Sequence, residues 1–433
     1  MAKKKAEKPK REFTKRQLSR WQQQKRRQRI IFGSGILIIV AVLSVVGAGV
    51  YFGWYVPERQ PLQETVIEVN ETEFNMDYYL KMLKYEKMQL ESYGVSVLIE
   101  QMSYLADGAV EAIQHSELIR QEAAKLGISV SDEEVDEKFN SLDPPPSKEY
   151  RDVVRDTIRA QLLRDKLLNE YFEQQVPQTA EQRHIMAMFL ESASQANKVI
   201  DRLERGELFS EVAGELSLDS VCKEKKGDLG WHPRGILPML INSSVLEESA
   251  FSQEVGVISA PIPEDSKTKM VGYWLIEVEF VDEEEKIAQV NVILLGSEQE
   301  ANEVRARLEA GEDFATLAKE FSQHADSKDK GGELEVHQGD MSSAFDDFAF
   351  SAEIGVLSQP IADDTVSTEG GYWLVKVTEI DNNRQIANED RDILKADALN
   401  KWVEGLFDDP ENKVVSNLDD AKKLWAIMHA VGG

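Results

Sequence analysis

The feature that most constrains the fold of this chain is an internal duplication. Residues 196–217 (ANKVIDRLERGELFSEVAGELS) and residues 301–322 (ANEVRARLEAGEDFATLAKEFS) are identical at 12 of 22 positions without a gap, at an offset of 105. Further along, the tetrapeptide GYWL occurs at 272–275 and again at 371–374, at an offset of 99. Composition alone does not produce a match of this length. The segment from about 182 to 380 is therefore a tandem repeat.

Each copy shows the same order of local patterns: a strand, a helix, a short helix, a glycine-rich turn, a further helix and a closing strand that begins at GYWL. The glycine-rich turns are KKGDLGW at 225–231 and KGGELEV at 330–336. Because the offset falls from 105 to 99, the first copy carries about six extra residues around 236–245.

The N-terminal region has a charge pattern opposite to the rest of the chain. Residues 1–29 hold 13 Lys or Arg and two acids, although the whole chain has a net charge of -28. Residues 30–57 then contain no charged residue and end among aromatic side chains. About 20 apolar residues cross a bilayer as a helix, so we predict a transmembrane helix over residues 30–56. The alternative, a cleaved signal peptide, has an apolar run of only about 7–15 residues.

The positive-inside rule then assigns a topology. Residues 1–29 become a basic cytoplasmic tail, and everything beyond the span becomes extracytoplasmic. The lipid bilayer is thus one expected partner, through a single helix in the cell membrane. Nucleic acid is not expected, because topology and anionic lipid account for the basic tail and the exterior is acidic.

The segments that flank the repeat are helical in pattern. Asn75 is positioned to cap one helix, and Ser131 with Glu134 forms a capping box for another. The sequence DPPPS at 143–147 interrupts the pattern before a long helix resumes. The final segment, from 385 onward, is also helical, and it either packs on the N-terminal helices or forms a free amphipathic helix. Trp402 favours burial.

Cysteine and histidine usage gives little support for other chemistries. The one cysteine, Cys222, cannot form an internal disulfide, and its neighbours suggest a structural role. The six histidines do not show metal-binding spacing such as HExxH, and we find no phosphate-loop or nucleophile motif. We therefore expect neither a metal nor a cofactor.

The sequence resembles a known class of proteins at two places. The run ELIRQEAAKLGISVSDEEVDEKF, preceded by the strand VIEVN, resembles the N-terminal helical domain of the SurA and PrsA class of extracytoplasmic folding factors. The two repeats resemble parvulin-type (PpiC-type) peptidyl-prolyl cis-trans isomerase domains, and the likeness covers roughly residues 60 to 430.

The resemblance implies an α+β architecture in which a helical chaperone domain is completed by the C-terminal segment, and each parvulin-like domain is a small antiparallel sheet wrapped by helices. The expected organisation is a basic cytoplasmic tail at 1–29, a transmembrane helix at 30–56, a SurA-like helical domain at 62–178, parvulin-like domains at 182–282 and 286–381, and a C-terminal helical segment at 385–433 that packs on the first helical domain.

In the first copy the resemblance implies two catalytic residues, His184 on the first strand and Asp219 ahead of the glycine-rich turn. The methionine position of the proline-binding slot falls at Leu237 or Met239, and the phenylalanine position at Leu246. The alternative for His184 is a hydrogen-bonded histidine at the start of a strand.

In the second copy the slot residues implied by the resemblance are Met341 and Phe345, with a plain core pair as the alternative. Val292 stands where the first histidine is expected, and His324 lies nearest to the acidic position, so His324 completes the expected catalytic set.

The family's last-strand histidine is replaced by Trp274 and Trp373. An indole donates a hydrogen bond but neither titrates nor accepts one. We expect both tryptophans to be walls of an apolar groove, and we add Phe251 and Phe350 to the expected substrate-binding set.

Two functions follow from the resemblance. One is a membrane-anchored, extracytoplasmic prolyl isomerase and chaperone that assists unfolded or newly exported polypeptides. The other is a membrane-tethered holdase whose parvulin-like domains bind such segments without catalysing rotation.

Overall fold

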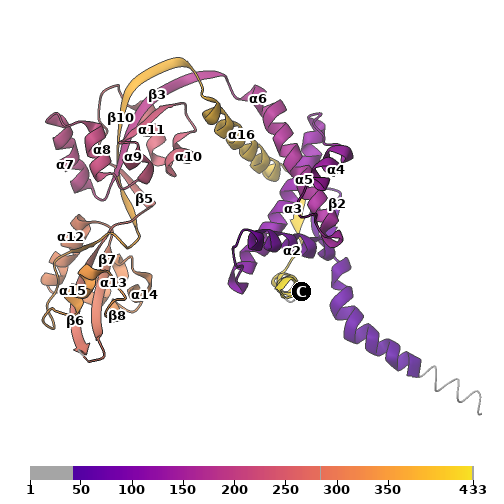
Figure 1. Ribbon diagram of the computed structural model, residues 1–433, viewed down its shortest axis with the longest axis horizontal. Helices are drawn as coiled ribbons and strands as arrows, with labels where there is room; N and C mark the ends of the chain where they lie inside the picture. Colours follow the sequence, from indigo (N-terminus) through magenta and orange to yellow (C-terminus); the bar gives the residue numbers. More distant parts are fainter. Residues whose placement is uncertain (1–41, 283, 432–433) are drawn as a thin grey trace, which may run out of the picture. The chain divides into compact units, whose positions relative to one another are not determined.

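The computed structural model describes residues 42–282 and 284–431. They belong to two compact units, which are described one at a time (Figure 1). The first unit comprises the chain up to residue 169 together with the chain from residue 400 onward, and the second comprises residues 170–399. Helices and antiparallel strands occur in both, which confirms the predicted α+β class.

The first unit is a helical domain with a small sheet. Its helices are α2 (Met76–Ser92), α3 (Met102–Lys125), α4 (Asp132–Asn140), α5 (Arg151–Lys166) and α17 (Asp420–Val431), with 3₁₀ turns at Pro61–Gln63, Ile99–Gln101 and Lys148–Tyr150. The strand β1 (Thr65–Val69) pairs on one side with β2 (Thr72–Asn75) and on the other with β11 (Val414–Ser416). Because β11 comes from the C-terminal segment, the two ends of the chain build one sheet.

Local signals explain where these helices begin. The Asn75 side chain accepts a hydrogen bond from the backbone N–H of Tyr78, and Ser131 and Glu134 cap each other reciprocally, so both predicted caps are confirmed. The interior is apolar, and Tyr79 is among its fully buried side chains.

The predicted transmembrane helix lies only partly within the described residues. Residues 42–50 are α-helical and exposed, and a π-helical segment, η1 (Tyr51–Arg59), follows them. Residues 30–41 lie outside the described part of the chain. Among the described helices, none combines the length and the apolar character that crossing a membrane requires.

The second unit contains two sheets and their covering helices. The helices are α6 (Phe172–Gln175), α7 (Ala193–Glu204), α8 (Phe209–Leu216), α9 (Ser220–Glu224), α10 (Leu237–Ile241), α11 (Val245–Ser252), α12 (Glu298–Glu309), α13 (Phe314–Phe321), α14 (Ala325–Lys328) and α15 (Ser343–Ala349). Two helical segments cross the limits between the units in the sequence, namely the π-helical η5 (Leu167–Tyr171) and α16 (Asn388–Asp408). The strands are β3 (Thr179–Leu190), β4 (Asp228–His232), β5 (Ile262–Lys269), β6 (Gly272–Asp282), β7 (Ile287–Leu295), β8 (Glu333–His337), β9 (Ile361–Asp363) and β10 (Thr368–Gln385).

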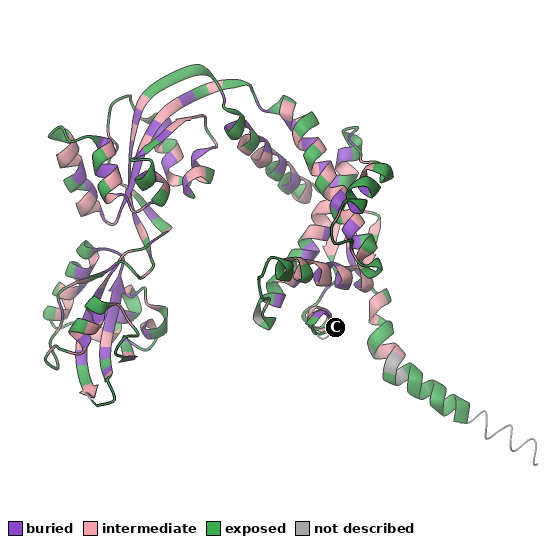
Figure 2. Ribbon diagram, viewed as in Figure 1, coloured by how far each residue is buried: buried purple, intermediate pink, exposed green. Residues whose placement is uncertain are grey.

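Both sheets are four-stranded and antiparallel, in the orders β4-β3-β10-β5 and β8-β7-β6-β9. Side chains alternate between the two faces of a strand. Along β3, Ile185, Ala187 and Phe189 enter one apolar core, whereas Met188 and Leu190 enter the other. The stretch of each central strand that enters the cores is therefore buried on both faces, whereas the C-terminal part of β10, residues 379–385, is exposed (Figure 2).

The closing strands are exchanged between the two copies. β6, the GYWL strand of the first copy, pairs with β7 and β9 of the second copy. β10, the GYWL strand of the second copy, pairs with β3 and β5 of the first. The structure thus corrects the expectation that each GYWL strand closes its own copy. The first sheet is built from residues 179–269 and 368–385 and the second from 272–363, in place of 182–282 and 286–381.

The sequence contains the physical reason for the exchange. The two closing strands share the GYWL tetrapeptide, so either one fits either sheet. In the first copy, only residues 283–286 separate the end of β6 from the start of β7. A short turn makes the β6–β7 hairpin a local contact with a small loop-closure entropy. β10 has no such turn and continues to Gln385, and so it pairs along β3 as far as Thr179.

A buried lysine lies where the chain crosses between the sheets. Lys269, the last residue of β5, is 3% exposed, and its Nζ donates to the backbone carbonyl of Glu369 at 3.0 Å and to that of Gly370. Both carbonyls belong to the start of β10. Burial lowers the pKa of Lys269 to about 8, although Glu300 and Glu191 oppose this shift. The buried Lys269 side chain thus holds the start of β10 through two hydrogen bonds to backbone carbonyls.

We predict that engineered disulfides report the exchange. Met186 is the partner of Lys376 across β3–β10, whereas Glu277 is the residue of β6 that corresponds to Lys376. Paired residues of antiparallel strands have the Cα spacing that a disulfide needs. The Met186→Cys/Lys376→Cys variant should form an intramolecular disulfide, detected by mass spectrometry of tryptic peptides. The matched Met186→Cys/Glu277→Cys variant should not, and efficient crosslinking of that pair would refute the exchange.

We also predict a pH dependence from Lys269. Because its pKa is about 8 when folded and 10.5 when unperturbed, the unfolded chain binds the proton more tightly. The free energy of unfolding should therefore rise as pH increases from about 8 towards 10.5. Urea unfolding at pH 8 and pH 10 measures this rise, which should be smaller in Lys269→Met. An equal rise in both proteins would contradict the assignment.

Candidate active site

The first candidate site lies on one face of the first sheet and combines both copies. Trp373 of β10 packs against Phe189 of β3, with ring centroids 4.8 Å apart. The Lys267 ammonium lies over both rings, 5.3 Å from the Trp373 centroid and 5.8 Å from that of Phe189. Asp219 forms an ion pair with Lys267 at 3.0 Å. The predicted acid Asp219 and the predicted groove residue Trp373 are thus linked through a lysine that sequence reasoning missed.

Asp219 already has structural partners. One of its oxygens pairs with Lys267, and the other accepts the backbone N–H of Cys222 at 2.8 Å as the N-cap of α9. Lys267 also donates to the carbonyl of Ile241 at 2.7 Å. Burial raises the pKa of the Cys222 thiol well above its ordinary value, so this cysteine is not a poised nucleophile.

His184 lies in a different cluster. Its Nδ1 is 2.7 Å from the Thr378 hydroxyl, its Nε2 is 3.3 Å from an Asp228 carboxylate oxygen, and its ring contacts Trp231 edge-on at 5.6 Å. Among the described residues, these contacts of His184 share no residue with those of Asp219, and no hydrogen bond or ion pair joins the two side chains directly.

The offset of the duplication corrects the position that was expected for the first histidine in the second copy. At the constant offset of 105, Val292 of the second copy corresponds to Ala187, not to His184. Ala187 is fully buried in the same core cluster as Trp373. His184 stands three residues earlier, near the point where the register of β3 against β4 shifts.

The second candidate site is an aromatic cluster on the second sheet. The ring of Trp274 contacts His324 at 5.2 Å and Phe345 at 5.1 Å, both edge-on. The Trp274 indole N–H donates to Asp363 at 3.0 Å. His324 Nδ1 is 2.8 Å from the Ser327 hydroxyl, and burial lowers the pKa of His324, which favours the neutral imidazole. The structure therefore brings the predicted residues His324, Phe345 and Trp274 together.

The acids beside the two tryptophans are a repeated element that sequence reasoning missed. Glu264 and Asp363 are related by the offset of 99. Burial opposes ionisation of both, but hydrogen bonds outweigh it and hold their pKa values below the ordinary range. Ser243 donates to Glu264 at 2.5 Å, and Trp373 is among the groups that lower the pKa of Glu264. The Trp373 indole N–H itself lacks a partner at hydrogen-bond distance among the described residues.

Most side chains that were expected to line the proline slots are buried in the protein's own cores. Five of these side chains are fully buried, namely those of Leu237, Leu246, Trp274, Phe345 and Trp373. Phe251 is 6% exposed, with the guanidinium groups of Arg183 and Arg234 lying 5.3 and 4.6 Å from its ring centroid. Met341 and Phe350 are half-buried at the edge of the second cluster.

We predict that Asp363 and Trp274 are energetically coupled. Asp363→Ala leaves the buried indole N–H unsatisfied, which should lower the free energy of unfolding by about 1–3 kcal/mol. In the Trp274→Phe background the same substitution should be clearly less destabilising. Urea denaturation of the two single variants and the double variant gives the coupling energy. Strict additivity would contradict the hydrogen bond, and Asp364→Ala, beside it in the chain, is the control.

Two families of known domains match segments of this chain. The PPIC-type PPIASE (rotamase) domain family matches residues 184–279 and 293–379, and the SurA-like N-terminal domain family matches residues 23–153.

Foldase protein PrsA of Caldanaerobacter subterraneus subsp. tengcongensis is 32% identical over 195 residues, which cover 41% of this chain and 58% of the relative. Foldase protein PrsA 4 of Bacillus cereus is 40% identical over 108 residues, which cover 25% of this chain and 37% of the relative. The matches thus span well under two thirds of the length of these relatives.

Among solved structures, a peptidylprolyl isomerase (PrsA) from Bacillus anthracis matches with a TM-score of 0.30 and 11% identity, over 74% of this chain and 94% of that one. The family matches, and not this low-scoring structural likeness, carry the assignment. Over part of its length the chain is similar to PrsA foldases, and it joins a segment that matches the SurA-like N-terminal domain to two segments that match the PPIC-type domain family.

Proposed function

We propose that this protein is an extracytoplasmic peptidyl-prolyl cis-trans isomerase and chaperone, held at the cell membrane by one N-terminal helix, that acts on unfolded or newly exported polypeptides. The observation that carries the proposal is the match of two consecutive segments to the PPIC-type isomerase family behind a SurA-like domain. Its relatives, named as PrsA foldases, support the same reading.

The reaction is the rotation of an X-Pro bond over a barrier of roughly 18–20 kcal/mol, and no covalent bond changes. An apolar site promotes rotation by removing water from the imide and by placing donors that favour the twisted amide. In the second site, Phe345 and Met341 supply an apolar wall, and the Trp274 ring lies against Phe345 with its one N–H donated to Asp363. In the first site, the Asp219–Lys267 pair lies beside Trp373 and is the polar group available to a substrate carbonyl.

Membrane attachment is supported by the chain around residue 50. Residues 42–50 are helical and exposed, and Val45 is 73% exposed although it is apolar. An uncharged, exposed helix preceded by a strongly basic tail is typical of an anchor whose N-terminus is cytoplasmic. The bulk of the chain is then extracytoplasmic.

A second candidate function is a holdase that binds polypeptides without catalysing rotation. The specific observation in its favour is that the slot positions Leu237, Leu246 and Phe345 are fully buried, and that a tryptophan replaces the family's last-strand histidine in both copies. A slot filled by its own side chains has no room for a proline ring unless it opens.

Cis-trans exchange of a short X-Pro peptide, measured by NMR exchange spectroscopy with the full chain, separates the two functions. We predict exchange above the spontaneous rate. Asp219→Asn, which keeps the cap oxygen but removes the charge, and Phe345→Leu should each reduce the enhancement several-fold. The exposed variant Lys198→Ala is the control. If exchange never exceeds the spontaneous rate while an unfolded protein is still kept from aggregating, the holdase function holds and the isomerase function fails.

A further inference from the structure

The last helix of the chain, α17, carries a stripe of exposed apolar side chains. Leu424 is 60% exposed, Met428 64% and Val431 40%. Positions four and seven apart lie on one face of a helix, so the three side chains form a single stripe. The opposite face is buried, because Ala426 and Ala430 pack into the core of the helical unit. Helix α17 is therefore amphipathic, and its apolar stripe points away from that core.

The C-terminal turn of α17 is joined to the segment that follows the predicted membrane span. The His429 imidazole has its Nε2 3.1 Å from a carboxylate oxygen of Glu58, and its Nδ1 lies 2.7 Å from the backbone carbonyl of Trp425. Glu58 belongs to η1 and lies two residues beyond the predicted span at 30–56. This end of α17 is thus held at the level where a helix that spans the bilayer would leave it.

Further contacts fix the rotation of α17 about its own axis. Lys422 forms an ion pair with Glu64 at 3.2 Å, and Lys423 pairs with Asp107 of α3. Ion pairs at partly exposed sites contribute little stability, so the buried face holds the helix in place and the ion pairs select its orientation. The stripe therefore keeps one direction relative to the helical unit.

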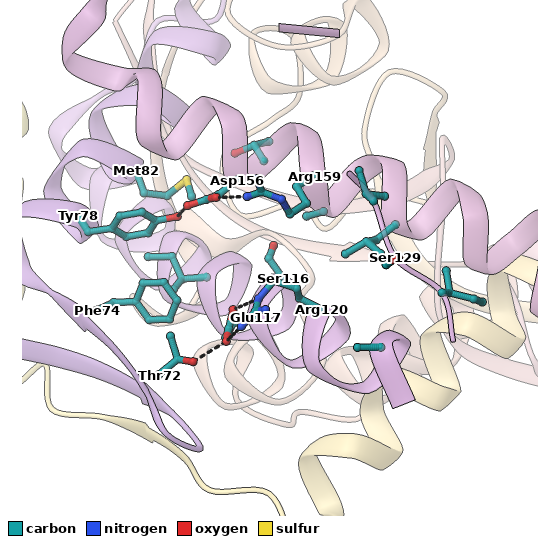
Figure 3. Close-up of a pocket in the computed structure, with 17 residues that line it drawn as sticks. Thr72, Phe74, Tyr78, Met82, Ser116, Glu117, Arg120, Ser129, Asp156 and Arg159 are labelled. Atoms are coloured by element: carbon teal, nitrogen blue, oxygen red, sulfur yellow. Dashed lines mark hydrogen bonds and ion pairs between the residues drawn. The ribbon is translucent and has the colours of Figure 1, made fainter. Parts of the chain in front are cut away.

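The elements beneath α17 are joined to one another by hydrogen bonds. The Tyr78 hydroxyl of α2 donates to Asp156 of α5 at 3.0 Å, and the Thr72 hydroxyl of β2 donates to Glu117 of α3 at 2.6 Å. Figure 3 shows both bonds at a cavity of about 470 Å³ among these elements. Because α17 packs against α2 and α3, this connected body determines where the stripe points.

The direction of α17 suits a membrane surface. In Figure 1, α17 (yellow, beside the label C) is seen along its axis, whereas the helical segment 42–59 runs across the view and extends away from the unit. Both lie at the same edge of the unit, in agreement with the contact between His429 and Glu58. A helix that binds a membrane surface lies in the plane of the interface, across the direction of a spanning helix.

The composition of α17 favours lipid as the occupant of this face. From residue 421 to residue 431 the sequence is AKKLWAIMHAV, which contains no acid that a membrane surface would repel. Its two lysines already have carboxylate partners, so apolar contact and not charge would drive the association. An apolar helix face beside the end of a membrane anchor reaches the boundary between headgroups and acyl chains without any further movement of the chain.

We propose that α17 is a membrane-interface helix, and that Leu424, Met428 and Val431 insert into the bilayer surface beside the N-terminal anchor. The inference rests on the proposed function, because it requires the N-terminal membrane helix. It adds a second membrane contact to that anchor. A single helix leaves the attached unit free to turn about the helix axis, whereas two contacts fix which side of the helical unit faces lipid.

Quenchers carried by lipid measure this contact in the full chain, reconstituted into phosphatidylcholine vesicles. Leu424→Cys carries the fluorophore NBD on the stripe, and Glu137→Cys carries it at an exposed position of α4, which lies away from α17 (Figure 1). Val45→Cys reports on the N-terminal helix itself. The wild type, whose Cys222 is buried, is the labelling blank. The readout is quenching by phosphatidylcholine with a nitroxide on its acyl chain.

We expect the nitroxide lipid to quench the labels at positions 424 and 45 roughly twofold or more, and to leave the label at position 137 unchanged. Adding Met428→Glu to the Leu424→Cys protein should lower the quenching at position 424, because a carboxylate on the stripe resists insertion. Circular dichroism checks that each variant is folded, and the X-Pro exchange of Met428→Glu should equal that of the wild type.

The outcomes separate this inference from the anchor on which it rests. Equal quenching at positions 424 and 137, with position 45 quenched, overturns the inference and leaves the anchor standing. A label at position 424 that is shielded from aqueous iodide but not quenched by the lipid shows that protein covers the stripe, and it also overturns the inference. Absence of quenching at position 45 rejects the anchor and this inference with it.

Discussion

The pairing of β10 with β3 is the interaction on which the second unit depends. It runs from Tyr372 opposite Leu190 to Gln385 opposite Thr179, so one long strand contacts the other along its whole length. Because β10 is taken into the first sheet, the second sheet has to be closed by β6, which reaches it through a tight turn. Neither copy of the duplication is therefore a complete sheet by itself. Duplication made the exchange possible, since two closing strands with the same GYWL start fit the same place.

The exchange also decides which residues share a site. Trp373 of the second copy lies beside Phe189 and Lys267 of the first, and Trp274 of the first copy lies against Phe345 of the second. Tryptophan is large, and protein interiors are close-packed, so each ring occupies volume that would otherwise be open to a ligand. The fold needs only the apolar shell of these sites, whereas rotation of a prolyl bond needs an accessible slot and donors. This separation explains how a chain can retain the fold of an isomerase family while its site residues diverge.

The helical unit is stabilised differently, because its sheet combines β1 and β2 with β11, which lies more than 300 residues later in the chain. β11 pairs with β1, and Lys413 of the C-terminal segment forms an ion pair with Glu68. Exposed ion pairs contribute little stability, so the buried residues and the shared sheet hold these segments together.

The sequence by itself determined the local features and their number. Repeat matching found two copies, each with a GYWL strand, and capping patterns at Asn75 and Ser131 marked helix starts. These features depend on residues close together in the chain or on comparison of the chain with itself. Only the tertiary structure decided which GYWL strand closes which sheet, because the shared GYWL start gives no preference, and the outcome depends on the length of the connection and on pairing far along the chain. For the same reason, only the tertiary structure showed that Lys267 pairs with Asp219 and that His184 pairs with Thr378.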